Sequence, residues 1–444
     1  MRFWQKSKVV FLLRVQKHWQ FLIGLIFLLV LQSTNLFAIK DHNLPIISGA
    51  EQTEKYFPYL KNKRVSLVVN QTSLVGKSHL VDTLLNSGIT IINIFSPEHG
   101  FRGDVDAGEF FDNTKDKKTG LPLISLYGSK KKPTNQDLSE TDILIFDIQD
   151  VGARFYTYIS TLHYVMEACA ENKIELLLLD RPNPNMAFVD GPIMEPEFKS
   201  FVGMHPVPIL YGMSIGEYAK MINGEYWLSD SLKCKLKIIK LKNLTSRSKE
   251  YVLPVPPSPN LPNQLAIKLY ASLCLFEGTT ISVGRGTYFP FQVIGHPDLK
   301  SKDFEFTPIS IVGMSKNPPY ENKLCYGTDL RIEEKKTGAV KPGLDLCWLL
   351  YYYSIYPNNE KFFNNYFEKL AGNSQLRIQI IKGTPIEEIK KSWAFGLERF
   401  CAIREKYLLY LPRETLSSEK DLIVKSNKKT SKSFFSKIFS NSNL

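Results

Sequence analysis

The sequence predicts an α/β protein in which a Rossmann-like, mostly parallel sheet domain is followed by a second, smaller α/β or α+β domain that forms a cleft with it. Short apolar runs alternate with helix-like segments, which is typical of βαβ units. Four of these runs end in polar residues, as strands do when their carboxyl ends line a crevice. Two domains are expected because 444 residues exceed what one hydrophobic core usually serves.

The strands of the first domain are predicted from runs that are too apolar to lie on a surface. Helices are predicted at 79–86 and 154–172, and the second carries apolar residues at helical spacing from Phe155 to Cys169. A strand-like stretch at 208–211 precedes a third helix at 215–223. The four strand-like runs are 65–69, 91–95, 143–146 and 175–179.

A proline-rich segment at 253–262 predicts the boundary to the second domain, because proline disfavours both helix interiors and central strands. Beyond it come a glycine-rich loop at 277–287 and helices near 344–356 and 386–407. We therefore predict a first domain over residues 39–250, a second over 251–412, and a basic, mobile tail over 413–444.

The net charge of +12 comes mostly from the two ends of the chain. Residues 1–40 hold six Lys or Arg and no acid, and residues 413–444 hold seven Lys or Arg against three acids. The body is nearly neutral, so no nucleic-acid partner is expected.

Residues 1–38 are predicted to be an export signal, because a basic lead precedes the apolar stretch 21–31 and Ala38 offers a small residue at the cut. Eleven apolar residues reach only about 16 Å as a helix, against a hydrocarbon layer of roughly 30 Å. The protein is expected to be exported, periplasmic or secreted, with membrane attachment only if the signal stays uncleaved.

The six cysteines are widely spaced and form no C-x-x-C pair, so a disulfide framework is not expected. The seven histidines are scattered without paired spacing, so no metal is predicted. The loop 277–287 matches no phosphate-binding fingerprint, because Phe289 stands where a third glycine would be needed. No cofactor is expected.

The stretch after the run 91–95 is the densest in chemically active groups, and Glu98 is the leading candidate for a general acid or base. His99 and Arg102 follow closely and could tune its proton affinity. Asp106 and Glu109 offer a second carboxylate. The competing interpretation is a surface loop with an ordinary Glu–Arg pair.

The other strand exits supply candidate binding residues. Asp150 and Arg154 could instead form only an i, i+4 ion pair at a helix start, and Arg181 suits a substrate carboxylate or a structural Asp–Arg pair. Glu277 and Arg285 are expected to close the cleft from the second domain. The candidate binding residues are Asn70, Arg102, Gln149, Asp150, Arg154, Tyr156, Asp180, Arg181, Asn183, Glu277, Ser282 and Arg285.

Gly212-Met213-Ser214-Ile215-Gly216 matches the G-x-S-x-G nucleophile elbow, which leaves a serine esterase or amidase as an alternative function. Ser214 and Glu217 are also spaced as a helix capping box, and this simpler interpretation is favoured.

Ten segments resemble, in order, the exo-acting β-N-acetylmuramidases of glycoside hydrolase family 171, formerly a domain of unknown function. The resemblance runs from about residue 64 to residue 410. The segments are SPEHGFRG, DAGE, LPLISLYG, FDIQDVGARFYTYIST, LDRPNP, DGPI, SFVGMHPVPILYGMSIGEYAKM, PPSPNLP, FEGTTISVGRGT and PFQVIGHP.

The resemblance implies removal of terminal N-acetylmuramic acid from the non-reducing ends of peptidoglycan fragments. It places the family's proposed catalytic glutamate on Glu98. Glu109 or Asp106 would then be the second carboxylate, and Arg181 or Arg285 would pair with the lactyl carboxylate of the sugar. A protein that binds muropeptides without cleaving them is the remaining alternative.

Overall fold

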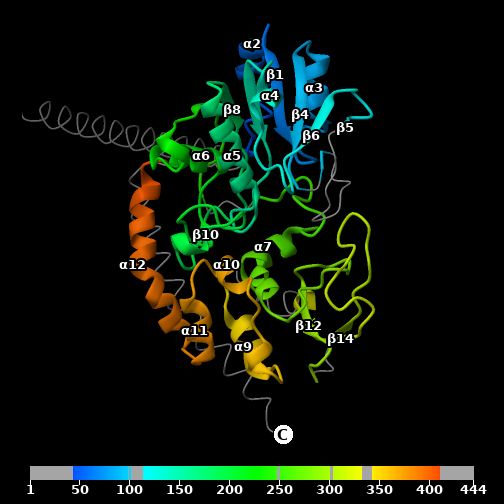
Figure 1. The fold of residues 1–444 in the computed structure, drawn as a ribbon, viewed down its shortest axis with the longest axis vertical. Helices are drawn as coiled ribbons and strands as arrows, with labels where there is room; N and C mark the ends of the chain where they lie inside the picture. Colours follow the sequence, from blue (N-terminus) through cyan, green and yellow to red (C-terminus); the bar gives the residue numbers. More distant parts are fainter. Residues whose placement is uncertain are drawn as a thin grey trace, which may run out of the picture.

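The computed structural model describes residues 44–98, 100–101, 114–247, 251–300, 304–332 and 343–410. A large sheet occupies the upper half of the molecule in Figure 1, and the C-terminal helices with a small sheet occupy the lower half. The prediction of an α/β protein with a further C-terminal domain is confirmed. The predicted domain boundaries stay predictions.

The large sheet has the strand order β11-β8-β7-β1-β4-β6-β5. All its neighbours are parallel except β5 and β6, which pair antiparallel at one edge. Its six parallel strands follow the Rossmann order. The strands are β1 (Arg64–Val69), β4 (Thr90–Ser96), β5 (Thr114–Lys115), β6 (Pro122–Ser125), β7 (Ile143–Asp147), β8 (Glu175–Leu179) and β11 (Lys235–Ile239).

The central strands are mostly apolar because both faces of the sheet are covered. In β7, Leu144 and Phe146 belong to one hydrophobic cluster, whereas Ile143 and Ile145 belong to the other. This alternation is the two-residue period of a strand. The helices associated with the sheet are α2 (Phe57–Leu60), α3 (Leu80–Asn86), α4 (Asn135–Leu138), α5 (Tyr158–Glu171) and α6 (Ile215–Gly224).

Strands β1 and β7 are neighbours, but the chain leaves β1 toward β4 on one side and leaves β7 toward β8 on the other. Open α/β sheets bind ligands at such a switch point, outside the carboxyl ends of the strands. All four predicted polar strand exits therefore lie at one edge of the sheet.

The C-terminal domain contains an antiparallel sheet of order β12-β14-β13. One hydrophobic cluster continues from the large sheet into this domain, since Phe146 of β7 and Phe367 of α10 both belong to it. The elements are α7 (Gln264–Leu273), β12 (Val293–His296), β13 (Glu305–Phe306), β14 (Cys325–Asp329), α9 (Cys347–Ile355), α10 (Phe367–Ala371), α11 (Gln375–Ile381) and α12 (Ile386–Glu405).

Helix α12 runs along the outside of the molecule from the C-terminal domain to the neighbourhood of α6 (Figure 1). At its end, Arg404 Nη2 donates to the carbonyl oxygen of Gly212 at 2.8 Å. Tyr407 then donates its hydroxyl to Glu225 at 2.6 Å. The last helix thus ties the two domains together.

The helix predicted at 154–172 begins later than expected, at Tyr158. Residues 153 and 154 instead pair with the chain beside β10 (Leu210–Tyr211), because Arg154 N donates to Ile209 O at 2.8 Å and Ala153 bridges Leu210. The remaining short strands are β2 (Leu74–Val75), β3 (Ser78–His79) and β9 (Val189–Asp190).

All six cysteines are free thiols, and Cys169, Cys234, Cys274 and Cys325 are buried. Among the described residues, no helix has both the length and the apolar character needed to cross a bilayer. The predicted signal at 1–38 and the tail at 413–444 lie outside the described residues.

Candidate active site

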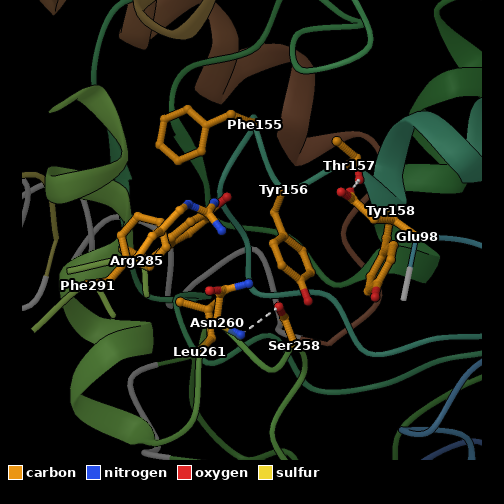
Figure 2. Close-up of a pocket in the computed structure, with 11 residues that line it drawn as sticks. Glu98, Phe155, Tyr156, Thr157, Tyr158, Ser258, Asn260, Leu261, Arg285 and Phe291 are labelled. Carbon is orange, nitrogen blue, oxygen red and sulfur yellow. Dashed lines mark hydrogen bonds between the residues drawn. The ribbon is translucent and has the colours of Figure 1, made fainter. Parts of the chain in front are cut away.

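A cavity lies where the carboxyl end of the large sheet meets the C-terminal domain (Figure 2). It encloses about 450 Å³ of empty space, including its open mouth. Its walls come from both domains. The lining residues are Glu98, Phe155, Tyr156, Thr157, Tyr158, Ser258, Asn260, Leu261, Tyr270, Arg285 and Phe291.

Glu98 enters the cavity because it follows the end of β4 by two residues. Its side chain is half-buried, and Thr157 Oγ1 lies 3.5 Å from Glu98 Oε2, a long hydrogen bond. The Tyr127 hydroxyl also hydrogen-bonds Glu98, and burial together with this carboxylate raises the pKa of Tyr127. Glu98 is thus a carboxylate held by hydroxyl groups at the wall of a cavity.

Aromatic rings form much of the cavity wall. Tyr156 packs edge-on against Tyr158, with ring centroids 4.8 Å apart, and against Tyr270 at 5.8 Å. The Tyr156 hydroxyl donates to Pro257 O at 2.8 Å, and Asn70 Nδ2 donates to the Tyr158 hydroxyl at 3.0 Å. The rings are therefore fixed, and they offer apolar faces of the kind that pack against a sugar ring.

Arg285 lines the cavity from the glycine-rich loop, and Glu277 lies behind it. Arg285 Nε donates to Glu277 Oε1, and this partner raises the pKa of Arg285. Both side chains are about one-quarter exposed. The structure thus brings these two predicted residues together, as the prediction of a cleft closed from the second domain requires.

Asp150 lies outside the set of lining residues and is almost fully buried. Its Oδ2 accepts hydrogen bonds from Gly152 N and the Tyr211 hydroxyl, whereas Oδ1 has no partner among the described residues. Burial raises the pKa of Asp150 to about 6. The alternative interpretation of Asp150 and Arg154 as an i, i+4 ion pair is not supported, because each side chain has other partners.

Arg154 is one of the predicted binding residues, and its side chain lies in the protein interior. Its side chain is fully buried, and its terminal nitrogens donate to the carbonyl oxygens of Pro192, Val207, Leu370 and Ala371 at 2.7–2.9 Å. Burial lowers the pKa of Arg154 to about 9. The guanidinium joins four backbone segments and does not face the cavity.

Asp180 and Arg181 are likewise engaged inside the protein. Arg181 Nε and Nη2 donate to Asp147 at 2.5 and 2.8 Å, so the structural Asp–Arg pair is present, although its acid is Asp147. Asp180 accepts hydrogen bonds from Ser214, Gly216 N and Tyr410, and burial raises its pKa to about 6. Neither residue lines the cavity.

Four other candidates are buried supports of the loops around the site. Gln149 Nε2 donates to Pro182 O at 2.6 Å, and Asn183 Nδ2 donates to Met213 O at 2.8 Å. Ser282 Oγ accepts a hydrogen bond from Gly284 N, and Asn70 Nδ2 donates one to the Tyr158 hydroxyl. Direct substrate contact by these side chains is not supported, because they are buried and bonded to protein.

His99, Arg102, Asp106 and Glu109 lie outside the described residues, so their roles stay predictions. Within the described ranges, no group of three or more His, Cys, Asp or Glu side chains is arranged as a metal site.

Ser214 is the N-cap of α6, as the favoured interpretation of its motif predicted. Its hydroxyl accepts from Glu217 N, and the Glu217 carboxylate accepts from Ser214 N. The hydroxyl also donates to Asp180 Oδ2 at 2.7 Å, and the side chain is fully buried. This environment disfavours a role as an esterase nucleophile.

Sequence reasoning missed several residues that line or flank the cavity. Ser258 and Asn260 belong to the proline-rich segment, which was interpreted only as a boundary. Tyr158 was assigned to the core because it falls on the apolar stripe of its helix. Tyr127 follows β6, an additional strand exit within a segment quoted only for the family resemblance.

Comparisons with known proteins agree on one family. The model of the exo-β-N-acetylmuramidase NamZ N-terminal domain matches residues 65–265, and that of the C-terminal domain matches residues 268–410. A peptidoglycan β-N-acetylmuramidase NamZ from Bacillus subtilis (strain 168) is 41% identical over 373 residues, which cover 80% of this chain and 89% of that protein.

Two crystal structures of DUF1343 family proteins from Bacteroides fragilis NCTC 9343 are also similar. One is 48% identical with a TM-score of 0.75, covering 83% of this chain and all of the other. The second is 28% identical with a TM-score of 0.68, covering 82% and 99%. Sequence and architecture therefore agree across both domains, and the chain belongs to the NamZ family of exo-β-N-acetylmuramidases.

Proposed function

We propose that the protein is an exo-acting glycosidase that hydrolyses the β-1,4 bond after a terminal N-acetylmuramic acid at the non-reducing end of peptidoglycan fragments. The observation that carries the proposal is Glu98, a hydroxyl-bonded carboxylate at the wall of a cavity on the sheet edge where α/β proteins bind ligands. The name of the similar Bacillus subtilis enzyme supports the choice of sugar.

Glu98 acts as the general acid in this proposal. Its protonated carboxyl gives a proton to the departing glycosidic oxygen, which lowers the barrier to breaking the bond to C1. Glycoside hydrolysis usually needs a second carboxylate to activate water or to stabilise the positively charged transition state. Glu109 or Asp106, a few residues along the chain, are the candidates for that role.

The wall of the cavity carries both apolar rings and hydrogen-bonding groups, as a sugar site does. The fixed rings of Tyr156 and Tyr270 would pack against the sugar, and Ser258 and Asn260 bring hydrogen-bonding groups to the wall. These features support binding of a sugar, and the name of the similar Bacillus subtilis enzyme supports a muramic acid unit.

The test is Glu98→Gln, which keeps the shape of the side chain but cannot supply the proton. With a chromogenic β-N-acetylmuramide, we expect kcat to fall by about 10²–10⁴-fold. Glu175→Gln is the matched control, because Glu175 also accepts a tyrosine hydroxyl, from Tyr59 at 2.6 Å, but lies at the opposite end of its strand. Turnover by Glu98→Gln near that of the control would remove Glu98 from this role.

Two further measurements test the alternative functions. A protein that only binds muropeptides would show tight binding by calorimetry with no released sugar. A serine esterase would lose ester hydrolysis in Ser214→Ala, and the buried capping role of Ser214 argues against it.

The substrate is a cell-wall polymer, so the proposed function places the enzyme outside the cytoplasm, periplasmic or secreted. The basic and apolar leader over residues 1–38 supports export. Amino-terminal sequencing of the protein recovered from cell fractions checks this, and a mature protein beginning at Met1 in the cytosol would contradict it.

A further inference from the structure

Among the described residues that line the cavity, one charged group of each sign is present. Of its eleven lining residues, Glu98 is the acidic one and Arg285 is the basic one. Figure 2 shows them on opposite sides, with Tyr156 between them. A ligand that spans the cavity therefore meets a carboxyl group at one end and a guanidinium at the other.

Arg285 is held in one orientation by protein contacts. Nε donates to Glu277, and the guanidinium carbon lies 5.1 Å from the centroid of the Phe291 ring. Phe291 is itself fixed, since it is buried and packs edge-on against Tyr270 with ring centroids 5.0 Å apart. Such a guanidinium is pre-organised for a planar partner.

The backbone of Phe291 is unusual, because φ is +57° at a bulky residue. Such conformations are rare outside glycine and are concentrated at ligand-binding and catalytic positions. Here the conformation places the Phe291 ring beneath Arg285, at the wall of the cavity. The strained backbone at Phe291 thus helps to position the guanidinium of Arg285.

The terminal nitrogens of Arg285 remain available for a ligand. Within the described part of the chain, its hydrogen bond to protein is made through Nε, which leaves four N–H groups. The predicted alternative, Arg181, is different, because Nε and Nη2 bind Asp147 and Nη2 also donates to Leu74 O. Arg285 is therefore the better receptor for a carboxylate.

We propose that Arg285, positioned by Glu277 and Phe291, binds the lactyl carboxylate of the terminal sugar and thereby selects N-acetylmuramic acid over N-acetylglucosamine. The two sugars differ only by this lactyl ether on O3. C3 is separated from C1 by one ring carbon, and its equatorial substituent points away from the C1 side of the ring. A sugar whose C1 faces Glu98 can therefore direct its lactyl carboxylate toward another wall of the cavity, where Arg285 lies. The inference rests on the proposed function.

The test compares two chromogenic β-glycosides that differ only in the lactyl group. Wild-type enzyme should prefer the N-acetylmuramide, and Arg285→Met should reduce the ratio of the two kcat/KM values by about 100-fold, because a charge-assisted contact is lost. A third substrate carries a neutral methyl amide in place of the lactyl carboxylate. Wild-type enzyme should hydrolyse it with a lower kcat/KM than the N-acetylmuramide, and Arg285→Met should not lower that kcat/KM further.

Arg331→Met is the matched control. Arg331 also pairs with an acid, Asp329, and its guanidinium carbon lies 3.7 Å from the Phe289 ring centroid, but it does not line the cavity. The double variant Glu277→Gln/Arg285→Met removes the carboxylate left unpaired by Arg285→Met. It should show the same loss of preference as Arg285→Met alone.

Calorimetry separates this inference from the proposed function. Free N-acetylmuramic acid should bind Glu98→Gln and should bind Glu98→Gln/Arg285→Met much more weakly. No hydrolysis of any substrate by wild type would overturn the proposed function but not the binding result. An unchanged preference and unchanged binding in the Arg285 variants would overturn the assignment of Arg285.

Discussion

Ser214 matches the G-x-S-x-G nucleophile motif, but its hydroxyl caps a helix. Replacement by alanine removes the N-cap of α6 and one hydrogen bond to buried Asp180. We expect Ser214→Ala to lower the free energy of unfolding by about 1–2 kcal/mol, as lost caps do. Release of N-acetylmuramic acid per folded molecule should stay near wild type, and a large loss of kcat would contradict the capping role.

A buried pair of histidines joins α5, which carries His163, to the segment before β10, which carries His205. His205 Nε2 lies 3.0 Å from His163 Nδ1, and His205 Nδ1 lies 3.0 Å from the Tyr218 hydroxyl, while Trp227 stacks on the His205 ring. Burial lowers the pKa of His163 to about 4 and that of His205 well below its usual value. Both rings are therefore neutral in the folded protein at neutral pH.

These shifts predict acid sensitivity. A histidine with pKa about 6.5 in the unfolded chain and about 4 in the folded protein stabilises the fold fully above pH 6.5. As pH falls from 6.5 to 4, the unfolded chain takes up the proton first, so the free energy of unfolding drops by up to about 1.4 kcal/mol per pH unit for each ring. Urea denaturation of His163→Gln should show a shallower decline than wild type.

Asp150 and Asp180 act with the opposite sign in an overlapping window. Their pKa values are raised to about 6, so the folded protein holds a proton that the unfolded chain releases between about pH 4 and 6. Their contribution rises as pH falls. Both remain in His163→Gln, so the difference between the two curves isolates the histidine, and parallel curves would contradict its assignment.

The connection from β7 to α5 is the element on which the cavity most depends, because residues 155–158 line it. Gly152 begins this connection with φ +78°, and a Cβ there would meet the Asn183 side chain at 2.2–2.6 Å. Asn183 in turn holds the loop after β8 through Met213 O. The glycine therefore permits two strand exits to pack together.

We expect Gly152→Ala to cost about 1–3 kcal/mol of unfolding free energy and to raise KM, because both the backbone and the neighbouring loop must shift. Gly76→Ala is the control, since Gly76 has φ +59° but open space around its added Cβ. Gly76→Ala should lower the free energy of unfolding only through its unfavourable backbone conformation, without a steric clash. Equal effects of the two substitutions on KM, measured with the chromogenic substrate, would contradict a special role for this connection.

Secondary structure and the position of the site were largely predictable from the sequence. Apolar runs such as 143–146 predicted the strands correctly because both faces of the sheet are buried, and the polar residues after them predicted the edge at which the cavity lies. Which polar side chains face that cavity was less predictable. Arg154 and Asp180 follow strands as Glu98 does, but their side chains are buried. The backbone of each residue hydrogen-bonds to a neighbouring segment, Arg154 to Ile209 and Asp180 to Ile239.

At the scale of the whole molecule, the cavity depends on contacts between distant segments that no local pattern encodes. Arg285 and Phe291 face Glu98 only because the C-terminal domain packs over the sheet edge. Arg154 contributes to this packing, since its Nη1 binds the 192–207 region and its Nη2 binds the end of α10. A buried arginine of this kind resembles a ligand-binding arginine in sequence.

We expect Arg154→Met to lower the free energy of unfolding by about 3 kcal/mol or more, because it removes the guanidinium donor from four backbone carbonyl groups, of which Val207 O also accepts a hydrogen bond from Met194 N. Arg64→Met is the control, since Arg64 pairs with Asp142 on the exposed surface, where an ion pair contributes little to stability. Urea titration of both variants makes the comparison. A small effect of Arg154→Met would contradict its structural role.

Tyr410 follows α12 and donates its hydroxyl to Asp180, which directly follows β8. The first domain is thus stabilised by a residue that lies 230 positions later in the sequence. Glu98 is translated long before Arg285, Phe291 and this last support. A nascent chain still attached to the ribosome therefore holds the acid without the opposite wall of its pocket. We therefore expect no glycan cleavage until the chain up to Tyr410 has been made and has packed against the first domain.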